Sequence, residues 1–205
     1  MEDKFRVEID LSFAKTRAEQ VRDELIFLRA KYNLSDFEYC KLVSITPLKI
    51  PYSHPEIVLN TFIHGELALL SSYLHEQMHW YLTWYSHAKP DGWESLREEL
   101  KRRYPDVPPA IGGGARDEDS TYLHLIINWL EVETVNHFVR RDEAENHVKN
   151  LPYYHWIYET VLTDWISLEQ LYHLSNLLPI KLAPQMSDEE LKIASSFDEK
   201  KINVF

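Results

Sequence analysis

The first third of the chain alternates between apolar and polar residues over short stretches, which is typical of β-strands. Apolar residues at every second position from 5 to 13 predict a first strand, and residues 56–63 predict another. Residues 37–45 carry conflicting signals. Ser35 and Glu38 have the spacing of a helix capping box, whereas the apolar residues shortly before the next proline favour a strand. We interpret this segment as a strand.

Most of the remaining chain follows the 3.6-residue repeat of amphipathic helices. An early helix is expected at residues 14–31, where one stripe consists of Ala18, Val21, Leu25 and Leu28. Prolines and glycines between positions 104 and 120 predict a loop. Further helices are expected at residues 65–86, 91–103, 121–147 (which could break near Arg141) and 153–177, followed by a short helix capped by Ser187 and Glu190.

Strands that precede a run of helices predict an α+β fold, with a small N-terminal sheet followed by a mainly helical body. The chain has 205 residues, of which 44% are hydrophobic, and this size fits one domain. We therefore expect a single domain over residues 1–205 that is strand-rich over 1–64 and helical over 65–205.

Charge and cysteine content narrow the possible partners and surroundings. The net charge of −11 argues against nucleic acid and against an anionic membrane, because both are bound by clustered Lys and Arg. Cys40 is the only cysteine, so the chain has no internal disulfide. The charged start lacks the apolar run of a secretory signal, and apolar stretches fall short of the roughly 18 residues of a membrane span. We expect a cytoplasmic protein and leave its oligomeric state open.

The motif with the clearest chemistry is His75-Glu-Gln-Met-His79, in the middle of the helix expected at 65–86. Residues four apart lie one above the other on a helix, so the two imidazoles can bind one metal ion. Zinc suits imidazole ligands and keeps an open position when three protein groups bind it. A zinc-bound water has its pKa lowered from about 16 to about 7, and Glu76 is placed to take its proton. The motif predicts a zinc site with Glu76 as the catalytic base.

Through His75, Glu76 and His79, in a long helix after a strand, the sequence resembles the zincin metallopeptidases. The resemblance implies a zincin-like domain, a zinc cofactor and a peptide or small amide as substrate. It also implies that the preceding strand, residues 56–63, binds extended peptide at the edge of the sheet. The metzincin subclass has a Gly and a third His six residues after the second. It does not fit, because that position is Tyr85 and no Gly intervenes.

The gluzincin subclass instead takes its third ligand, a glutamate, from a later helix, and here Glu131 and Glu133 are the candidates. His124, Asn128 and Glu131 share one helix face at i, i+4 and i+7. Polar groups on one face of so apolar a helix are explained by a metal and the residues that hold its ligands. We favour Glu131 as the third metal ligand over Glu133, with His124 or Asn128 orienting a ligand.

A zinc peptidase also needs a donor that stabilises negative charge on the attacked carbonyl oxygen. The candidates cluster at the start of the helix expected at 153–177, and we select Tyr154 from the set Tyr153, Tyr154, His155 and Tyr158. The loop with Gly112–Gly114 could close over a substrate, but we interpret it as an ordinary connection.

Three functional hypotheses follow. The first is a zinc-dependent hydrolase, in the form of a metallopeptidase. The alternative is a zincin-like interaction protein that binds zinc without catalysis, and the third is a metal-free protein with a chance motif. Glu76 favours the first hypothesis, since a purely structural zinc site has no use for that carboxylate.

Overall fold

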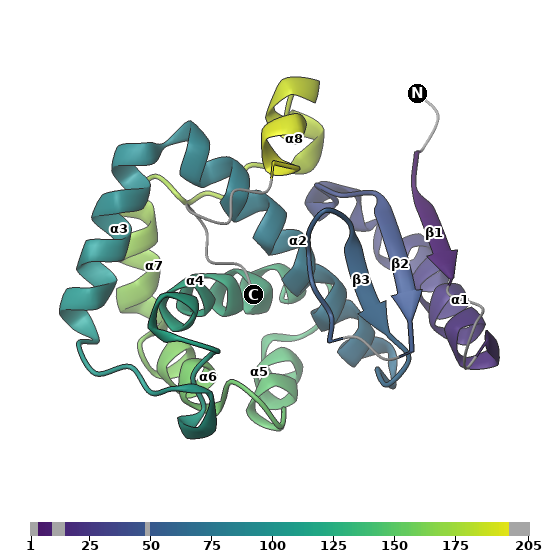
Figure 1. Ribbon diagram of the computed structural model, residues 1–205, viewed down its shortest axis with the longest axis horizontal. Helices are drawn as coiled ribbons and strands as arrows, with labels where there is room; N and C mark the ends of the chain where they lie inside the picture. Colours follow the sequence, from purple (N-terminus) through teal and green to yellow (C-terminus); the bar gives the residue numbers. More distant parts are fainter. Residues whose placement is uncertain (1–3, 10–14, 48–49, 197–205) are drawn as a thin grey trace.

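The computed structural model describes residues 4–9, 15–47 and 50–196. Three short strands form a parallel sheet in the order β1–β2–β3, and helices make up most of the remaining chain (Figure 1). The expected α+β fold, with a small N-terminal sheet and a mainly helical body, is confirmed. The strands are β1 (Arg6–Ile9), β2 (Leu42–Thr46) and β3 (Ile57–Asn60), and the helices are α1 (Lys15–Tyr32), η1 (Leu34–Phe37), α2 (Glu66–Ala88), α3 (Pro90–Arg103), η2 (Ala110–Gly112), α4 (Glu118–Val135), α5 (Arg141–Lys149), α6 (His155–Thr163), α7 (Trp165–Leu174), η3 (Ala183–Gln185) and α8 (Asp188–Ala194).

β2 and β3 are shorter than the sequence pattern predicts. The helical signal at Ser35 belongs to η1, and only the later part of the ambiguous segment 37–45 is a strand. The helix expected at 153–177 is two helices, α6 and α7, which meet at Asp164. Aspartate competes with the helical backbone for hydrogen bonds and favours helix ends. Residues 10–13 of the first expected strand lie outside the described residues.

The sheet is built around the crossover from β1 through α1 to β2. Both strand pairs are parallel, and Val43 of β2 is paired with Val7 of β1 and Ile57 of β3. The predicted apolar stripe of α1 is completely buried. This helix contacts β1, β2 and α2, so it covers one face of the sheet and touches the helical body.

The outer edge of β3 is not free at its centre. Tyr52 forms an antiparallel bridge with Val58, and each residue donates its backbone N–H to the carbonyl of the other at 3.1 and 2.8 Å. The chain itself therefore occupies part of the edge at which the zincin resemblance implies peptide binding. An added peptide strand would have to displace Tyr52 there.

Helix α2 is the central element of the helical body. It begins after Gly65, whose φ of 90° is a conformation that side chains disfavour. It contacts β3, α1, α4 and α8, among others, and most of its residues are buried. Apolar residues lie on all its faces, which is typical of an interior helix, but α2 also buries polar residues such as Glu76 and His79. Within the described residues, no helix is both long and apolar enough to cross a membrane.

A buried ion pair fixes α2 against the sheet layer. The side chain of Glu38, which follows η1, is fully buried and accepts hydrogen bonds from Arg29 of α1 and from the Tyr73 hydroxyl of α2. Arg29 binds both carboxylate oxygens, at 2.5 and 2.7 Å. Such paired geometry offsets the cost of burying the charges. This contact sets the position of the helix that carries His75 and His79.

Arg29→Ala should lower the free energy of unfolding by about 3 kcal/mol, because it leaves the Glu38 carboxylate buried without its cation. Urea unfolding followed by circular dichroism measures the loss. The control is Arg22→Ala, which removes an exposed pair with Asp23 and should change stability by no more than about 0.5 kcal/mol. Equal stability of the two variants would show that the Glu38 contact does not hold α2.

Candidate metal centre

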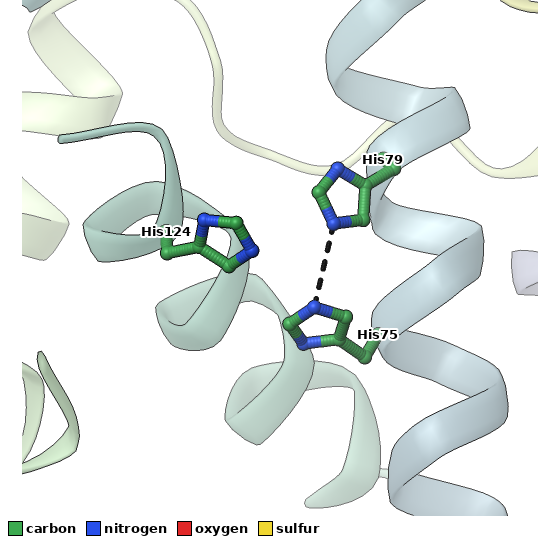
Figure 2. Close-up of side chains that lie close together, drawn as sticks. All are labelled: His75, His79 and His124. Atoms are coloured by element: carbon green, nitrogen blue, oxygen red, sulfur yellow. Dashed lines mark hydrogen bonds between the residues drawn. The ribbon is translucent and has the colours of Figure 1, made fainter. Parts of the chain in front are cut away.

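Three histidines from two helices converge in the interior of the helical body. His75 and His79 come from α2, and His124 comes from α4, with its ring directed toward the other two (Figure 2). One ring nitrogen from each lies within 4.8 Å of the other two. The sequence predicts the pair on α2, and the structure adds His124 as the third member of the group.

The spacing of the two histidines on α2 fits a metal ion. Their Nε2 atoms lie 3.3 Å apart. Two nitrogens bound to one tetrahedral zinc, each at about 2.0–2.1 Å, are about 3.3–3.4 Å apart. These nitrogens can share either a proton or a metal ion.

Hydrogen bonds determine which nitrogen of each ring faces the group. His75 Nδ1 lies 2.8 Å from Glu131 Oε2, and since a carboxylate only accepts, this nitrogen carries the proton. His124 Nδ1 lies 2.7 Å from the carbonyl oxygen of Ser120, so it is a donor for the same reason. When His75 and His124 are neutral, the lone pair of each ring is therefore on Nε2. Metal-binding histidines are held in this way, with the second nitrogen bonded to a carboxylate or a carbonyl.

The surroundings keep His79 and His124 neutral. Burial, together with the charge of His75, lowers the pKa of His124 to about 3 and holds the pKa of His79 well below its usual value. Burial also disfavours the charged form of His75, but the hydrogen bond to Glu131 and the charge of that carboxylate outweigh it, so the pKa of His75 is raised. Two of the three rings therefore offer a lone pair at neutral pH, which a metal ion requires.

Glu76 is a buried carboxyl group beside the histidines. It is 5% exposed, none of the described hydrogen bonds involves its carboxyl group, and its oxygens are not among the fully buried side-chain atoms that lack a partner. The pKa of Glu76 is raised to about 7, mainly by burial; the charge of His75 opposes this rise and the charge of Glu131 adds to it. Its charge also raises the pKa of Tyr154, which lies against His124. Glu76 is thus close to the group and free to exchange a proton.

Glu131 lies behind His75, and its hydrogen bond to Nδ1 connects it to the ring nitrogen that faces away from His79. The hydroxyls of Ser71 and Tyr158 donate to the same carboxylate. Its position is that of a residue that orients a ligand, the role that the sequence analysis gave to His124 or Asn128. Asn128 is fully buried, and neither polar atom of its side chain has a partner among the described residues.

The other glutamate considered from sequence, Glu133, is partly buried, and none of the described contacts joins it to the histidines. The signal for His124 was present in the sequence, because it shares the polar face of Glu131. The sequence did not show which turn of that face meets His75 and His79.

Tyr154 caps the histidine group at the start of α6. Its hydroxyl lies 3.0 Å from His124 Nε2, and its ring packs on that of His124 with centroids 4.7 Å apart. The backbone of Tyr154 is left-handed, with φ of 58° and ψ of 27°. This conformation is uncommon for a residue other than glycine and is often found at functional sites. Of the other candidate donors, Tyr158 contacts Glu131, whereas Tyr153 and His155 are exposed.

The glycine loop before α4 is attached to the same end of α6. The carbonyl of Gly113 accepts the backbone N–H of Trp156, and a Cβ on Gly113 would lie 2.7 Å from that nitrogen. The φ of Gly113 is 89°. The loop therefore supports the backbone that positions Tyr154.

A cavity of about 310 Å³ lies between α5 and α6, next to the histidine group but not in it. Its wall includes Tyr158, whose hydroxyl bonds to Glu131. His75, His79, His124 and Glu76 do not line this cavity. The remaining lining residues are Val148, Lys149, His155, Glu159, Leu162 and Thr163.

Gly113→Ala should destabilise the protein by more than about 1 kcal/mol, because a side chain is strained at positive φ and Cβ here also meets the start of α6. The control is Gly65→Ala, which has nearly the same φ of 90° but no atom within 4 Å of the added Cβ. Chemical unfolding should show the larger loss for Gly113→Ala, and NMR should show shifted Tyr154 and His124 resonances in that variant alone. Similar losses and unshifted resonances would mean that the loop does not position Tyr154.

Comparison of the chain with protein-family models, curated proteins and solved structures gave no match. Three buried imidazoles, a carboxylate that orients one of them and a second carboxyl group without a partner form a donor set that could hold a metal ion.

Proposed function

We propose that the protein is a zinc-dependent hydrolase that cleaves a peptide or related amide bond, with zinc held by His75, His79 and His124. The observation that carries this proposal is the convergence of the three imidazoles beside the buried, unpartnered carboxyl group of Glu76. Three protein ligands leave a fourth position on tetrahedral zinc for water or substrate. The zincin resemblance of His75, Glu76 and His79 agrees with this proposal, although the third ligand is then His124 and not Glu131.

The choice of zinc follows from the ligand type. Imidazole ligands suit zinc, whereas magnesium and calcium prefer oxygen ligands. When bound, the ion lowers the pKa of a coordinated water to about 7 and polarises a carbonyl group. The protein contributes the orientation of the rings: Glu131 fixes His75, and the carbonyl of Ser120 fixes His124.

Glu76 and Tyr154 supply the proton transfer and the hydrogen bond that amide hydrolysis needs. Glu76 takes a proton from the attacking water and passes it to the leaving amine, for which a pKa of about 7 is well matched. Tyr154 has a raised pKa, caused first by burial, so its hydroxyl stays protonated and can donate to the carbonyl oxygen of the substrate. In the metal-bound protein His124 Nε2 would hold the ion, so the Tyr154 hydroxyl would be released from that nitrogen and able to donate to the substrate.

One observation favours a second candidate, a metal centre without catalysis. His79 and His124 are 6% and 8% exposed, and the cavity beside the centre is lined by other residues. Structural zinc sites are closed, whereas catalytic sites keep a position that small molecules can reach. Addition of a hydroxamate to cobalt-substituted protein separates the two: a changed visible spectrum indicates an open position, and an unchanged one indicates a structural centre.

Purified protein should contain about one zinc ion per chain, and His75→Ala, His79→Ala and His124→Ala should each remove it. Elemental analysis after dialysis measures this content. Glu131→Gln should retain zinc but bind it about 10- to 100-fold more weakly, because it removes an orienting carboxylate and not a ligand. The matched control is His87→Ala, which removes a histidine of the same helix outside the group of three. His87 Nδ1 bonds to the Thr83 carbonyl, and the variant should keep its zinc. If His124→Ala keeps its zinc and Glu131→Gln loses it, Glu131 is the third ligand.

Glu76→Gln should retain zinc and lower the rate of amide cleavage by about 10²- to 10⁴-fold, because glutamine cannot accept the proton. Activity is first sought with a mixed peptide pool and mass spectrometry, and the variants are then compared at equal zinc content. Glu66→Gln, an exposed position on α2, is the matched control and should cleave at the wild-type rate.

Equal rates for the wild-type protein and Glu76→Gln would contradict the role of Glu76 as the base. A strong loss of stability in Glu76→Gln would mean that Glu76 is a buried structural partner. The structural metal centre is the better interpretation if the wild-type protein cleaves no peptide in the pool and hydroxamate leaves the visible spectrum of the cobalt-substituted protein unchanged.

A further inference from the structure

The Glu131 carboxylate is almost completely buried, at 2% exposure, and has three hydrogen-bond donors from two other helices. Oε1 accepts from the Ser71 hydroxyl of α2. Oε2 accepts from the Tyr158 hydroxyl of α6 at 2.7 Å and faces His75 Nδ1 at 2.8 Å. A buried carboxylate needs such donors, because removal of its hydration costs several kcal/mol.

We propose that Ser71 and Tyr158 are positioning residues, which act through Glu131 to hold His75 in the tautomer with its lone pair on Nε2. The two hydroxyls bind different oxygens, so they fix the carboxylate in one orientation. In that orientation Oε2 accepts the Nδ1 proton of His75, and Nε2 faces His79 at 3.3 Å. The consequence for metal affinity rests on the proposed zinc site, whereas the tautomer of His75 can be measured without metal.

The two hydroxyl donors come from different helices. Ser71 lies one helical turn before His75, so α2 carries both the histidine and one support of its partner. Tyr158 is fully buried and adds the third helix to the contact. Without either hydroxyl, one oxygen loses a donor in a site that water does not freely enter, and the carboxylate can turn away from His75. His75 can then place its proton on Nε2, where it blocks metal binding.

The test removes each hydroxyl alone, in Ser71→Ala and Tyr158→Phe. In the metal-free wild-type protein, ¹⁵N NMR of the neutral His75 ring should show only the tautomer with the proton on Nδ1, and both variants should show a mixture. Zinc affinity, measured by competition with a chromophoric chelator, should fall by about 10-fold in each, the lower end of the effect of groups that orient a metal ligand. Ser71→Thr retains a hydroxyl and should restore both the tautomer and the affinity.

Tyr172→Phe is the matched control for a structural effect. Its hydroxyl is also fully buried and also donates to α4, at the Leu125 carbonyl, 3.1 Å away. The control should lose stability as Tyr158→Phe does, yet keep the wild-type tautomer and zinc affinity.

The outcomes separate this inference from the proposed zinc site. A wild-type His75 that is already a mixture of tautomers overturns the positioning role. The positioning role is also overturned if Ser71→Ala and Tyr158→Phe have the same His75 tautomer and the same zinc affinity as Tyr172→Phe. That result would leave the proposed zinc site unaffected. If the wild-type protein binds no zinc but both variants lose the single tautomer, the positioning role is upheld and the proposed function fails.

Discussion

A carboxylate in the protein interior must be surrounded by donors, and at Glu131 this requirement connects three helices. Ser71 and His75 of α2 and Tyr158 of α6 all bond to the one side chain, which α4 carries. Once these contacts form, the rings of His75 and His124 are placed against each other. The orientation of His75 in the histidine group therefore depends on how the buried carboxylate of Glu131 is satisfied.

The local part of the centre follows from the sequence, and the part that depends on helix packing does not. Two histidines four residues apart on an uninterrupted helix must share a face, and this is what α2 shows. His124 and Glu131 also share a face, but they are about 10.5 Å apart along α4 at 1.5 Å per residue. Which of them faces both His75 and His79 depends on how far α4 is shifted along α2. That shift is fixed by contacts distant in sequence, such as the hydrogen bond from Ser71 of α2 to Glu131 of α4 and the packing of α6 on α4.

The same distinction explains the rest of the fold. The stripe of α1 and the capping box of Ser187 and Glu190 are local patterns, and both are confirmed. Strand limits depend on partners: β3 is only Ile57–Asn60, and Tyr52 closes part of its outer edge. A period of two residues predicts that a segment is extended, but it does not identify its neighbour. The break between α6 and α7 at Asp164 also depends in part on a tertiary contact, because the Asp164 carboxylate accepts a hydrogen bond from the Tyr104 hydroxyl.

Two features beside the three histidines are uncommon in a protein interior. Glu76 is a buried carboxyl group without a hydrogen-bond partner among the described residues, and Tyr154 has a left-handed backbone. A centre that only stabilises the protein gains nothing from either, since an apolar residue at position 76 would fill the same space without removing a carboxylate from water. The proposed hydrolysis would use both, because Glu76 can exchange a proton near neutral pH and the Tyr154 hydroxyl lies at Nε2 of His124. Located beside three convergent imidazoles, these two features support the proposed hydrolase over a structural metal centre.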